Sequence, residues 1–156
     1  MIIGGNGDKV TLDRNYWHDL SGRAPKIGGS TGLQVVQAVN NWFASNTGHN
    51  FDVSASGRVL IEGNRFESST TPITTATSTS AVFDVPDSGS TSTCSSPLGR
   101  VCVINALSGS GAWPSLKATQ VLTELGKYKA NLVKPIPYGD VKTTVSNNYG
   151  IGRIGN

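Results

Sequence analysis

One sequence pattern occurs three times in the first 70 residues of this chain, which has 156 residues. Each copy starts with a valine, continues with an apolar residue two positions later, and reaches an asparagine followed two positions on by an aromatic residue. The copies are Val10–Trp17, Val36–Phe43 and Val59–Phe66. The asparagines are 26 and 23 residues apart, and steps of this size mark stacked repeat architectures. Strands of an antiparallel β-sandwich usually recur every 8–12 residues, so the pattern favours a β-solenoid.

In a solenoid, each position of the pattern has a definite structural role. The alternating apolar residues face the interior of the coil from short parallel strands, which places Val10, Val36 and Val59 in register. The asparagines mark bends, where amide side chains can hydrogen-bond from one rung (one turn of the coil) to the next. The aromatic residues stack in the same way, with Trp17 on Phe43 and Phe43 on Phe66. The asparagines of the three copies are Asn15, Asn41 and Asn64.

Composition agrees with an all-β protein. Charged residues make up only 15% of the chain, whereas Gly, Ser, Thr and Asn are frequent, which favours turns and strands over long surface helices. The net charge of +3 comes without any dense run of Lys or Arg, so we expect no nucleic-acid partner. No apolar stretch approaches about 18 residues, so we expect no membrane span.

We divide the chain into three parts of one domain. Residues 1–70 form the β-helix rungs, 71–114 a Ser/Thr-rich loop followed by a disulfide loop, and 115–156 a helix and tail packed on the same domain. The repeat weakens after Phe66, and ten of the thirteen residues in Ser68–Ser80 are Ser or Thr, which predicts a polar loop.

Helical spacing appears between Ser115 and Leu132. Ser115 is a candidate N-cap, and Pro135 and Pro137 would end the helix. The apolar residues with this spacing are Leu116, Leu122, Leu125, Tyr128 and Leu132. They predict a helix packed on the side of the solenoid.

The only cysteines are Cys94 and Cys102, in a segment rich in Ser, Pro and Gly. They are either two free thiols or a pair that closes a small loop. We favour the disulfide, because the surrounding loop has little else to order it. A disulfide would imply folding in an oxidising compartment.

Several stretches, in order along the chain, are similar to fungal-type pectin lyases of the parallel β-helix pectate/pectin lyase family. The stretch with most chemistry is Ser21-Gly22-Arg23-Ala24-Pro25-Lys26. The others are Asn15-Tyr16-Trp17, Val39–Phe43, Gly48–Phe51, Leu60–Phe66, Leu98-Gly99-Arg100 between the cysteines, and Asn105-Ala106. Together they cover about two thirds of the chain, and the ordered set is far more specific than any one motif.

The resemblance implies a right-handed, single-stranded parallel β-helix and β-elimination of methyl-esterified α-1,4-linked galacturonan, which yields 4,5-unsaturated oligosaccharides. It implies that Arg23 is the base and that Lys26 binds substrate beside the cleft. It also implies a secreted, extracellular monomer that acts on the pectin of cell walls and needs no cofactor. Without the resemblance, Arg23 would be interpreted as a solvated turn residue.

Arginine is an unusual base, because a guanidinium normally keeps its proton. Arg23 could instead stabilise the negative charge that develops on the substrate. The acids of the chain form no D-x-D-x-D-G calcium loop, and His18 and His49, which we interpret as turn residues, have no ligand partners at metal-site spacing. We therefore expect no metal. A calcium-dependent pectate lyase remains an alternative.

We expect the chain to begin inside the solenoid, because family members have further rungs before the one at Val10. Those rungs supply other active-site residues. The second alternative function is therefore a catalytically inactive β-helix fragment, serving as a polysaccharide-binding or structural module.

Overall fold

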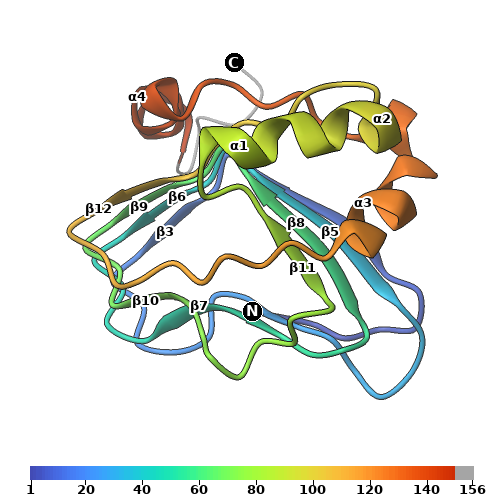
Figure 1. Cartoon of the computed structure of the whole chain (residues 1–156). Coiled ribbons are helices and arrows are strands. Elements are labelled where there is room, and N and C mark those ends of the chain that lie inside the picture. Colours follow the sequence, from blue (N-terminus) through green and yellow to red (C-terminus); the bar gives the residue numbers. More distant parts are fainter. Residues whose placement is uncertain (150–156) are drawn as a thin grey trace.

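The computed structural model describes residues 1–149 as a parallel β-solenoid of about three turns with short helices outside it (Figure 1). Three four-stranded sheets form the sides of the coil. Sheet 1 contains β1 (Ile2–Ile3), β4 (Lys26–Ile27), β7 (His49–Val53) and β10 (Thr71–Ile73). Sheet 2 contains β2 (Lys9–Asp13), β5 (Gln34–Val39), β8 (Gly57–Glu62) and β11 (Val82–Asp84). Sheet 3 contains β3 (Tyr16–His18), β6 (Trp42–Ala44), β9 (Arg65–Glu67) and β12 (Ala106–Ser108). The predicted parallel β-helix is confirmed.

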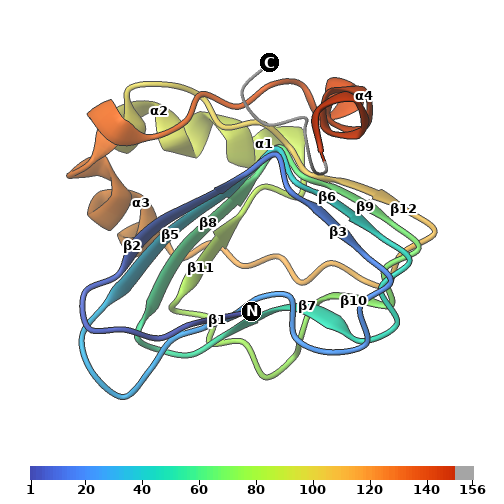
Figure 2. The same cartoon turned by 180° about the vertical axis from the view of Figure 1, so that it is seen from behind.

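Successive rungs stack in the register that the repeat predicts. Val10 pairs with Val36, and Val36 with Val59, on parallel strands of sheet 2. The view from behind shows strands of the three sheets running side by side from rung to rung (Figure 2). The glycine-rich segment Gly28–Gly32 lies in the turn that connects β4 to β5.

The asparagines form a hydrogen-bonded ladder at the bend between sheets 2 and 3. The side-chain amide of Asn15 donates to Oδ1 of Asn41 at 2.9 Å, and Asn41 donates to Asn64 at 2.9 Å. Asn64 in turn donates to Asn105 at 3.0 Å, so the ladder has one member more than the repeat predicted. The residue before three of these asparagines has a left-handed backbone, namely Arg14, Asn40 and Gly63. The side chains of Asn41, Asn64 and Asn105 also bind backbone N–H and carbonyl groups that the bend would leave unpaired.

Aromatic rings stack inside the coil as predicted. Trp17 lies on Phe43 with ring centroids 5.9 Å apart, and Phe43 lies on Phe66 at 4.6 Å. Trp113 meets Phe66 edge-on at 5.0 Å. The segment that carries Trp113 crosses the end of the coil between β12 and α3 (Thr119–Gly126) (Figure 1). It covers the last rung of the apolar interior.

The prediction of a polar loop over 68–80 is wrong, because β10 lies within it and pairs with β7. Ile73 and Ala81 from this region are buried in the core. A fourth rung continues through β11 and β12, with Asn105 in the ladder position. The repeat is hard to recognise here because the chain between Val85 and Asn105 leaves the coil.

This excursion carries the cysteines and packs on the coil. It contains α1 (Ser88–Thr91), η1 (Ser92–Cys94) and α2 (Ser95–Leu98). Cys94 and Cys102 form the predicted disulfide, with their Cα atoms 5.6 Å apart. Both guanidinium NH2 groups of Arg100 donate to the buried carboxylate of Glu62, at 2.9 and 2.6 Å. This two-point ion pair anchors the excursion to sheet 2.

The predicted helix after Ser115 is shorter than expected. It begins at Thr119, and Ser115 does not cap it. Lys117 instead forms a bridge with Phe83 of β11. The helix also ends early, at Gly126, and η2 (Lys129–Asn131) follows it. The backbone just before Thr119 pairs with β11 at the end of the coil. This pairing prevents a helix there, despite the helical spacing of the apolar residues.

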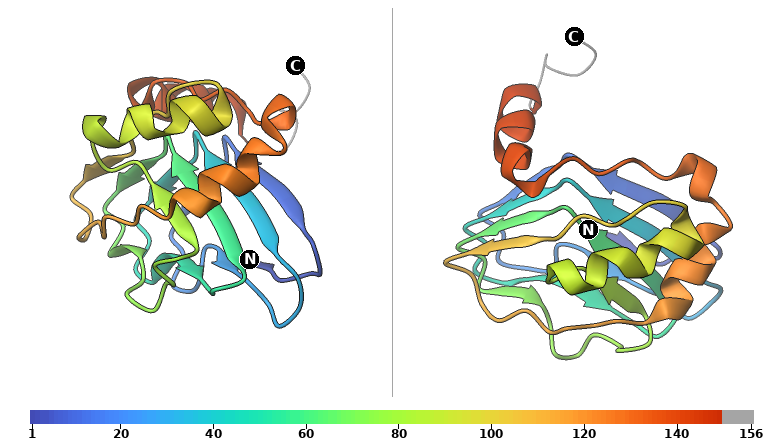
Figure 3. Two further views of the ribbon diagram at one scale, coloured as in Figure 1. Left: turned by 45° about the vertical axis from the view of Figure 1, so that its right-hand side comes forward. Right: turned by 45° about the horizontal axis from the view of Figure 1, so that its top comes forward.

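Two helices lie on different faces of the coil. Figure 3 shows α3 across the strands of sheet 2, where Val121, Leu122 and Leu125 pack on apolar residues. The sequence did not predict α4 (Tyr138–Asn148), which packs beside sheet 3 through Val141 and Val145. Within residues 1–149, no helix is both long and apolar enough to cross a membrane.

A buried carboxyl group holds the end of the coil. Asp84 is the partner of Ile61 on the neighbouring strand of sheet 2 and, like Ile61, faces the interior of the coil. Its side chain accepts a hydrogen bond from the N–H of Leu116 at 3.1 Å. Burial raises the pKa of Asp84 to about 7, although Lys117 opposes the rise and Asp87 adds to it. A titratable group thus occupies an interior position that other rungs fill with apolar side chains.

We predict that the asparagine ladder is a large part of the stability of the coil. Asn41 is fully buried, accepts the N–H of Asn15, and donates to Leu12 and Val39 carbonyls. Asn41→Ala should lower the free energy of unfolding by roughly 3–5 kcal/mol, because it leaves several buried polar groups unpaired. Asn15→Ala, at the exposed end of the ladder, should cost about 1 kcal/mol. Urea unfolding followed by circular dichroism measures both, and equal losses would contradict the prediction.

We predict that Asp84 makes the stability fall as pH rises from about 4 to about 7. Its folded pKa, about 7, lies above its ordinary value of 3.8, so the folded chain holds a proton that the unfolded chain releases in this window. The stabilisation is complete below about pH 4 and is lost by about pH 7. Asp84→Asn should abolish this slope, which should amount to roughly 2–4 kcal/mol. Melting temperatures from pH 4 to 8 measure it; an unchanged slope in the variant would refute the assignment.

Candidate functional site

Arg23 lies on the turn that leads from sheet 3 into sheet 1. It lies three residues before the start of β4, and its side chain is 56% exposed. The next rung supports this turn from one side, because the N–H of Gly48 donates to the carbonyl of Leu20 at 3.2 Å. Gly48 also lies so close to the Ser21 backbone that a Cβ there would collide with it. A glycine at this place therefore permits the two turns to stack, and the stacked turns fix the backbone of Arg23.

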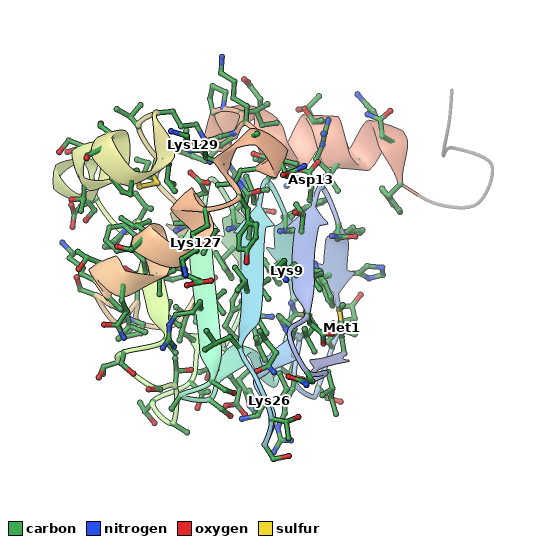
Figure 4. The ribbon with its side chains drawn as sticks, turned by 90° about the vertical axis from the view of Figure 1, so that its right-hand side faces the viewer. Met1, Lys9, Asp13, Lys26, Lys127 and Lys129 are labelled. Carbon is green, nitrogen blue, oxygen red and sulfur yellow. A yellow bond between two sulfur atoms is a disulfide. The ribbon has the colours of Figure 1, made fainter. Side chains whose placement is uncertain are left out.

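Lys26 lies three residues further on, in β4, with its side chain 23% exposed. The described helices lie beside sheets 2 and 3 and leave the outer side of sheet 1 uncovered (Figures 1 and 2). Figure 4 shows Lys26 at the end of the molecule away from Lys127 and Lys129, which belong to the helical side. The two basic residues singled out in the sequence are thus neighbours on an open face.

Asp52 of β7 connects these two basic residues. Its Oδ1 accepts a hydrogen bond from Nζ of Lys26 at 2.8 Å, and its Oδ2 lies 3.4 Å from Nε of Arg23. The Asp52 side chain is only 10% exposed. Charge-assisted contacts of this kind are stronger than neutral hydrogen bonds. The carboxylate therefore holds both cations at one place on the surface.

His49, predicted to be a turn residue, is instead the first residue of β7, and it is equivalent to Arg23 one rung further along. Its Nε2 is 3.9 Å from Oδ2 of Asp52, too far for a hydrogen bond. His18, at the end of β3, contacts Asp19 at 2.8 Å instead. The two histidines are therefore apart, each beside one aspartate. Among residues 1–149, no three His, Cys, Asp or Glu side chains gather as metal ligands would.

An open cavity borders Arg23 on the side of the first rung. Its volume is about 510 Å³, which exceeds the space that a single sugar unit needs. Its lining residues are Met1, Tyr16, Trp17, His18, Asp19, Leu20, Ser21, Gly22 and Arg23. The exposed guanidinium can therefore reach a ligand in this cavity from its rim.

A second, smaller cavity lies under α3 and η2. It measures about 230 Å³ and is mainly apolar, and Lys9 at its edge stands 5.3 Å from the ring centre of Tyr128. Figure 4 shows Lys9 and Lys26 well separated. None of the residues of the Arg23 site lines this cavity, so it is a distinct feature of the sheet 2 face.

Asp52 was not predicted as a site residue, although the sequence contains a signal for it. Asp52 lies 26 residues after Lys26, the same step that separates Asn15 from Asn41. Applying the step to Lys26 would have placed a carboxylate beside it, and the two residues do pair across neighbouring strands. Of the other acids considered, Glu62 binds Arg100, and Glu67 binds Arg65.

The arrangement suits chemistry on a substrate that develops negative charge. The exposed guanidinium of Arg23 and the ammonium of Lys26 present positive charge, and the described residues provide no hydrogen-bond acceptor for the outer nitrogens of Arg23. Preorganised cations of this kind stabilise an anion as it forms. The site therefore fits a reaction that passes through an oxyanion or enolate.

Known proteins match nearly the whole chain. "Probable pectin lyase F-1" of Aspergillus terreus is 40% identical over 99% of this chain and 41% of its own length. "Probable pectin lyase D" and "Pectin lyase B" of Emericella nidulans are 36% and 35% identical over 99% of the chain and 39% of their lengths. The chain thus spans about two fifths of the length of these relatives.

The sequence model of one protein family, described as "Pectate lyase", matches residues 4–150. That match covers almost all of the chain, including both residues of the Arg23–Lys26 pair and every strand of the three sheets except β1. The chain therefore belongs to the pectate lyase family.

Proposed function

We propose that this chain carries part of the active site of a pectin lyase, with Arg23 as the reacting residue and Lys26 as a substrate-binding residue. One observation supports this most strongly: Arg23 and Lys26 stand side by side on an open face, joined through Asp52, next to a cavity of about 510 Å³. The relatives named pectin lyase agree with it. The substrate would be methyl-esterified α-1,4-linked galacturonan.

The proposed reaction is a β-elimination. A base removes the proton from C5, which is α to the ester carbonyl at C6, and negative charge spreads onto the carbonyl oxygen. The electron pair then forms the C4–C5 double bond as the bond from C4 to the glycosidic oxygen breaks, and the leaving oxygen takes up a proton. The step needs a base and a cation near the carbonyl oxygen.

Arg23 can serve this reaction in one of two ways. As the base, it would accept the C5 proton, which requires a neutral guanidine group at the moment of transfer. As a charged group, it would stabilise the negative oxygen instead. The ion pair with Asp52 at 3.4 Å supports the second role, because a carboxylate attracts the charged guanidinium. In both roles the side chain must reach the sugar, and its exposure permits that.

The proposed setting is extracellular, with the enzyme acting as a monomer on pectin. The Cys94–Cys102 disulfide is compatible with folding in an oxidising compartment.

Replacement of Arg23 tests the proposal directly. Arg23→Ala removes an exposed side chain from a well-supported turn, so the free energy of unfolding should change by less than about 1 kcal/mol. If Arg23 is the base, Arg23→Ala and Arg23→Lys should each lower the rate on methylated pectin by about 10²–10⁴-fold. The absorbance of unsaturated uronide measures the rate.

Arg58→Ala is a matched control, because Arg58 lies in sheet 2 and contacts only nearby backbone carbonyls. Its rate should equal that of the parent chain. Rates within tenfold of the parent for both Arg23 variants would exclude the base role. A parent chain that binds methylated pectin without cleaving it would instead identify a polysaccharide-binding module.

Calcium should not affect the reaction. A methyl ester is uncharged and already withdraws electrons from C5, whereas a free carboxylate must first be neutralised by a cation. Chelator-treated protein should therefore cleave highly methylated pectin at the same rate with and without added Ca²⁺. A rise in rate on unesterified polygalacturonate after Ca²⁺ addition would favour a calcium-dependent pectate lyase.

A further inference from the structure

Asp52 is a buried carboxylate that contacts both cations of the candidate site. Its carboxylate is within 2.8 Å of Lys26 and 3.4 Å of Arg23. Neither the sequence motif that contains Arg23 and Lys26 nor the reaction scheme assigns it a role. Its position calls for one, because a largely buried charge is costly unless it is paired.

The backbone holds Asp52 firmly. Its strand β7 lies between β4 and β10 in sheet 1, and its N–H donates to the carbonyl of Pro25 at 3.1 Å. Lys26 is its direct partner across the two strands. The flanking residues Phe51 and Val53 are buried in the core. Asp52 is thus a short side chain on a rigid element, which is the best support for positioning another group.

The contact between Asp52 and Arg23 leaves the outer end of the guanidinium free. Asp52 approaches Nε, the inner nitrogen of the guanidinium. The two terminal NH2 groups make no hydrogen bond with the described residues, so they remain available to a substrate. An ion pair at Nε therefore limits the rotation of the guanidinium without occupying its outer face.

Asp52 also changes the charge of the site. Arg23 and Lys26 carry two positive charges, and Asp52 neutralises one of them, so that one net positive charge remains. One charge is enough to match the single negative charge that forms during elimination. Two unopposed charges would attract the carboxylates of unesterified galacturonan much more strongly than a neutral methyl ester.

We propose that Asp52 is a positioning residue that orients Arg23 and Lys26 and, by offsetting one of their charges, favours methyl-esterified over free galacturonate. This inference rests on the proposed function for its substrate, but the positioning of Arg23 is independent of it. The isosteric variant Asp52→Asn tests both roles, because it keeps the shape of the side chain and removes the charge.

The positioning is tested on the chain itself by nuclear magnetic resonance. Exchange of the Arg23 Nε–H with water should be at least fivefold faster in Asp52→Asn than in the parent chain. The matched control is Glu67→Gln, because Glu67 likewise holds an arginine and a lysine, Arg65 and Lys142, but on sheet 3. It should leave Arg23 unchanged. An exchange rate within twofold of the parent in Asp52→Asn would overturn the positioning role.

The selectivity is tested by affinity and rate. Calorimetry with trigalacturonate and its methyl ester should show that Asp52→Asn shifts the affinity ratio at least threefold toward the unesterified sugar. On highly methylated pectin, kcat should fall at least tenfold while KM changes less than threefold, and Glu67→Gln should match the parent. An unchanged ratio with kcat within twofold of the parent would overturn the selectivity role.

Two further outcomes are distinguishable. If the parent chain neither binds nor cleaves methylated galacturonan, the proposed function fails, and the exchange measurement still decides the role of Asp52 toward Arg23. If Asp52→Asn does not fold, Asp52→Glu replaces it. That variant keeps the charge but lengthens the side chain, so it should retain the preference for the ester and lose at least fivefold in kcat. Full kcat in Asp52→Glu would contradict positioning.

Discussion

The stacking of equivalent residues one rung apart is the constraint on which this structure depends. Each inner strand of the coil pairs with the strands above and below it, so a position is defined less by its neighbours in sequence than by its equivalents on the next rung, which lie 23–26 residues away within the first three rungs. The ladder of Asn15, Asn41, Asn64 and Asn105 is an example, because each amide binds the amide of the adjacent rung and three of the four also bind backbone groups of both rungs. A single slip of register would break the ladder and the aromatic stack together.

The same stacking builds the candidate site. Arg23 lies on a turn that has little structure of its own and is held by the turn of the next rung through Gly48. Lys26 and Asp52 face each other because their strands are paired in register. Chemistry at an exposed turn thus gains the rigidity of the coil, which is the usual requirement for groups that must hold a reacting atom in place.

The ends and flanks of the coil are held in place differently from the rungs. Charged and polar side chains there tie non-repetitive segments to the rungs, as Arg100 does through Glu62 and Val133 does through Gln37. Asp84 belongs to this group, since it anchors the segment that crosses the last rung. Burial inside the apolar coil raises the pKa of this carboxyl group, although the hydrogen bond from Leu116 opposes the rise. The flanking segments are thus held by specific polar contacts in addition to the apolar packing of α3 and α4, whereas the rungs are held by stacked, repeated positions.

By itself, the sequence determined the features that repeat or that lie close together along the chain. The spacing of Asn15, Asn41 and Asn64 was sufficient for the solenoid, its register and its stacked aromatics, and the short separation of Cys94 and Cys102 was sufficient for the disulfide. The motif around Arg23 was sufficient to place two basic residues in one candidate site.

Only the tertiary structure decided what depends on contacts between segments that share no local pattern. The fourth rung escaped prediction because an excursion separates Val85 from Asn105, and α4 escaped it because only Val141 and Val145 are buried in a polar helix. The helical spacing from Leu116 predicted a helix that begins too early, because Lys117 pairs with Phe83 at the end of the coil instead. Asp52 became the partner of Arg23 and Lys26 through rung stacking, which brings residues almost 30 positions apart within 4 Å. Local sequence sets the conformational preference of each segment, but burial and pairing in the assembled coil decide which conformation the segment adopts.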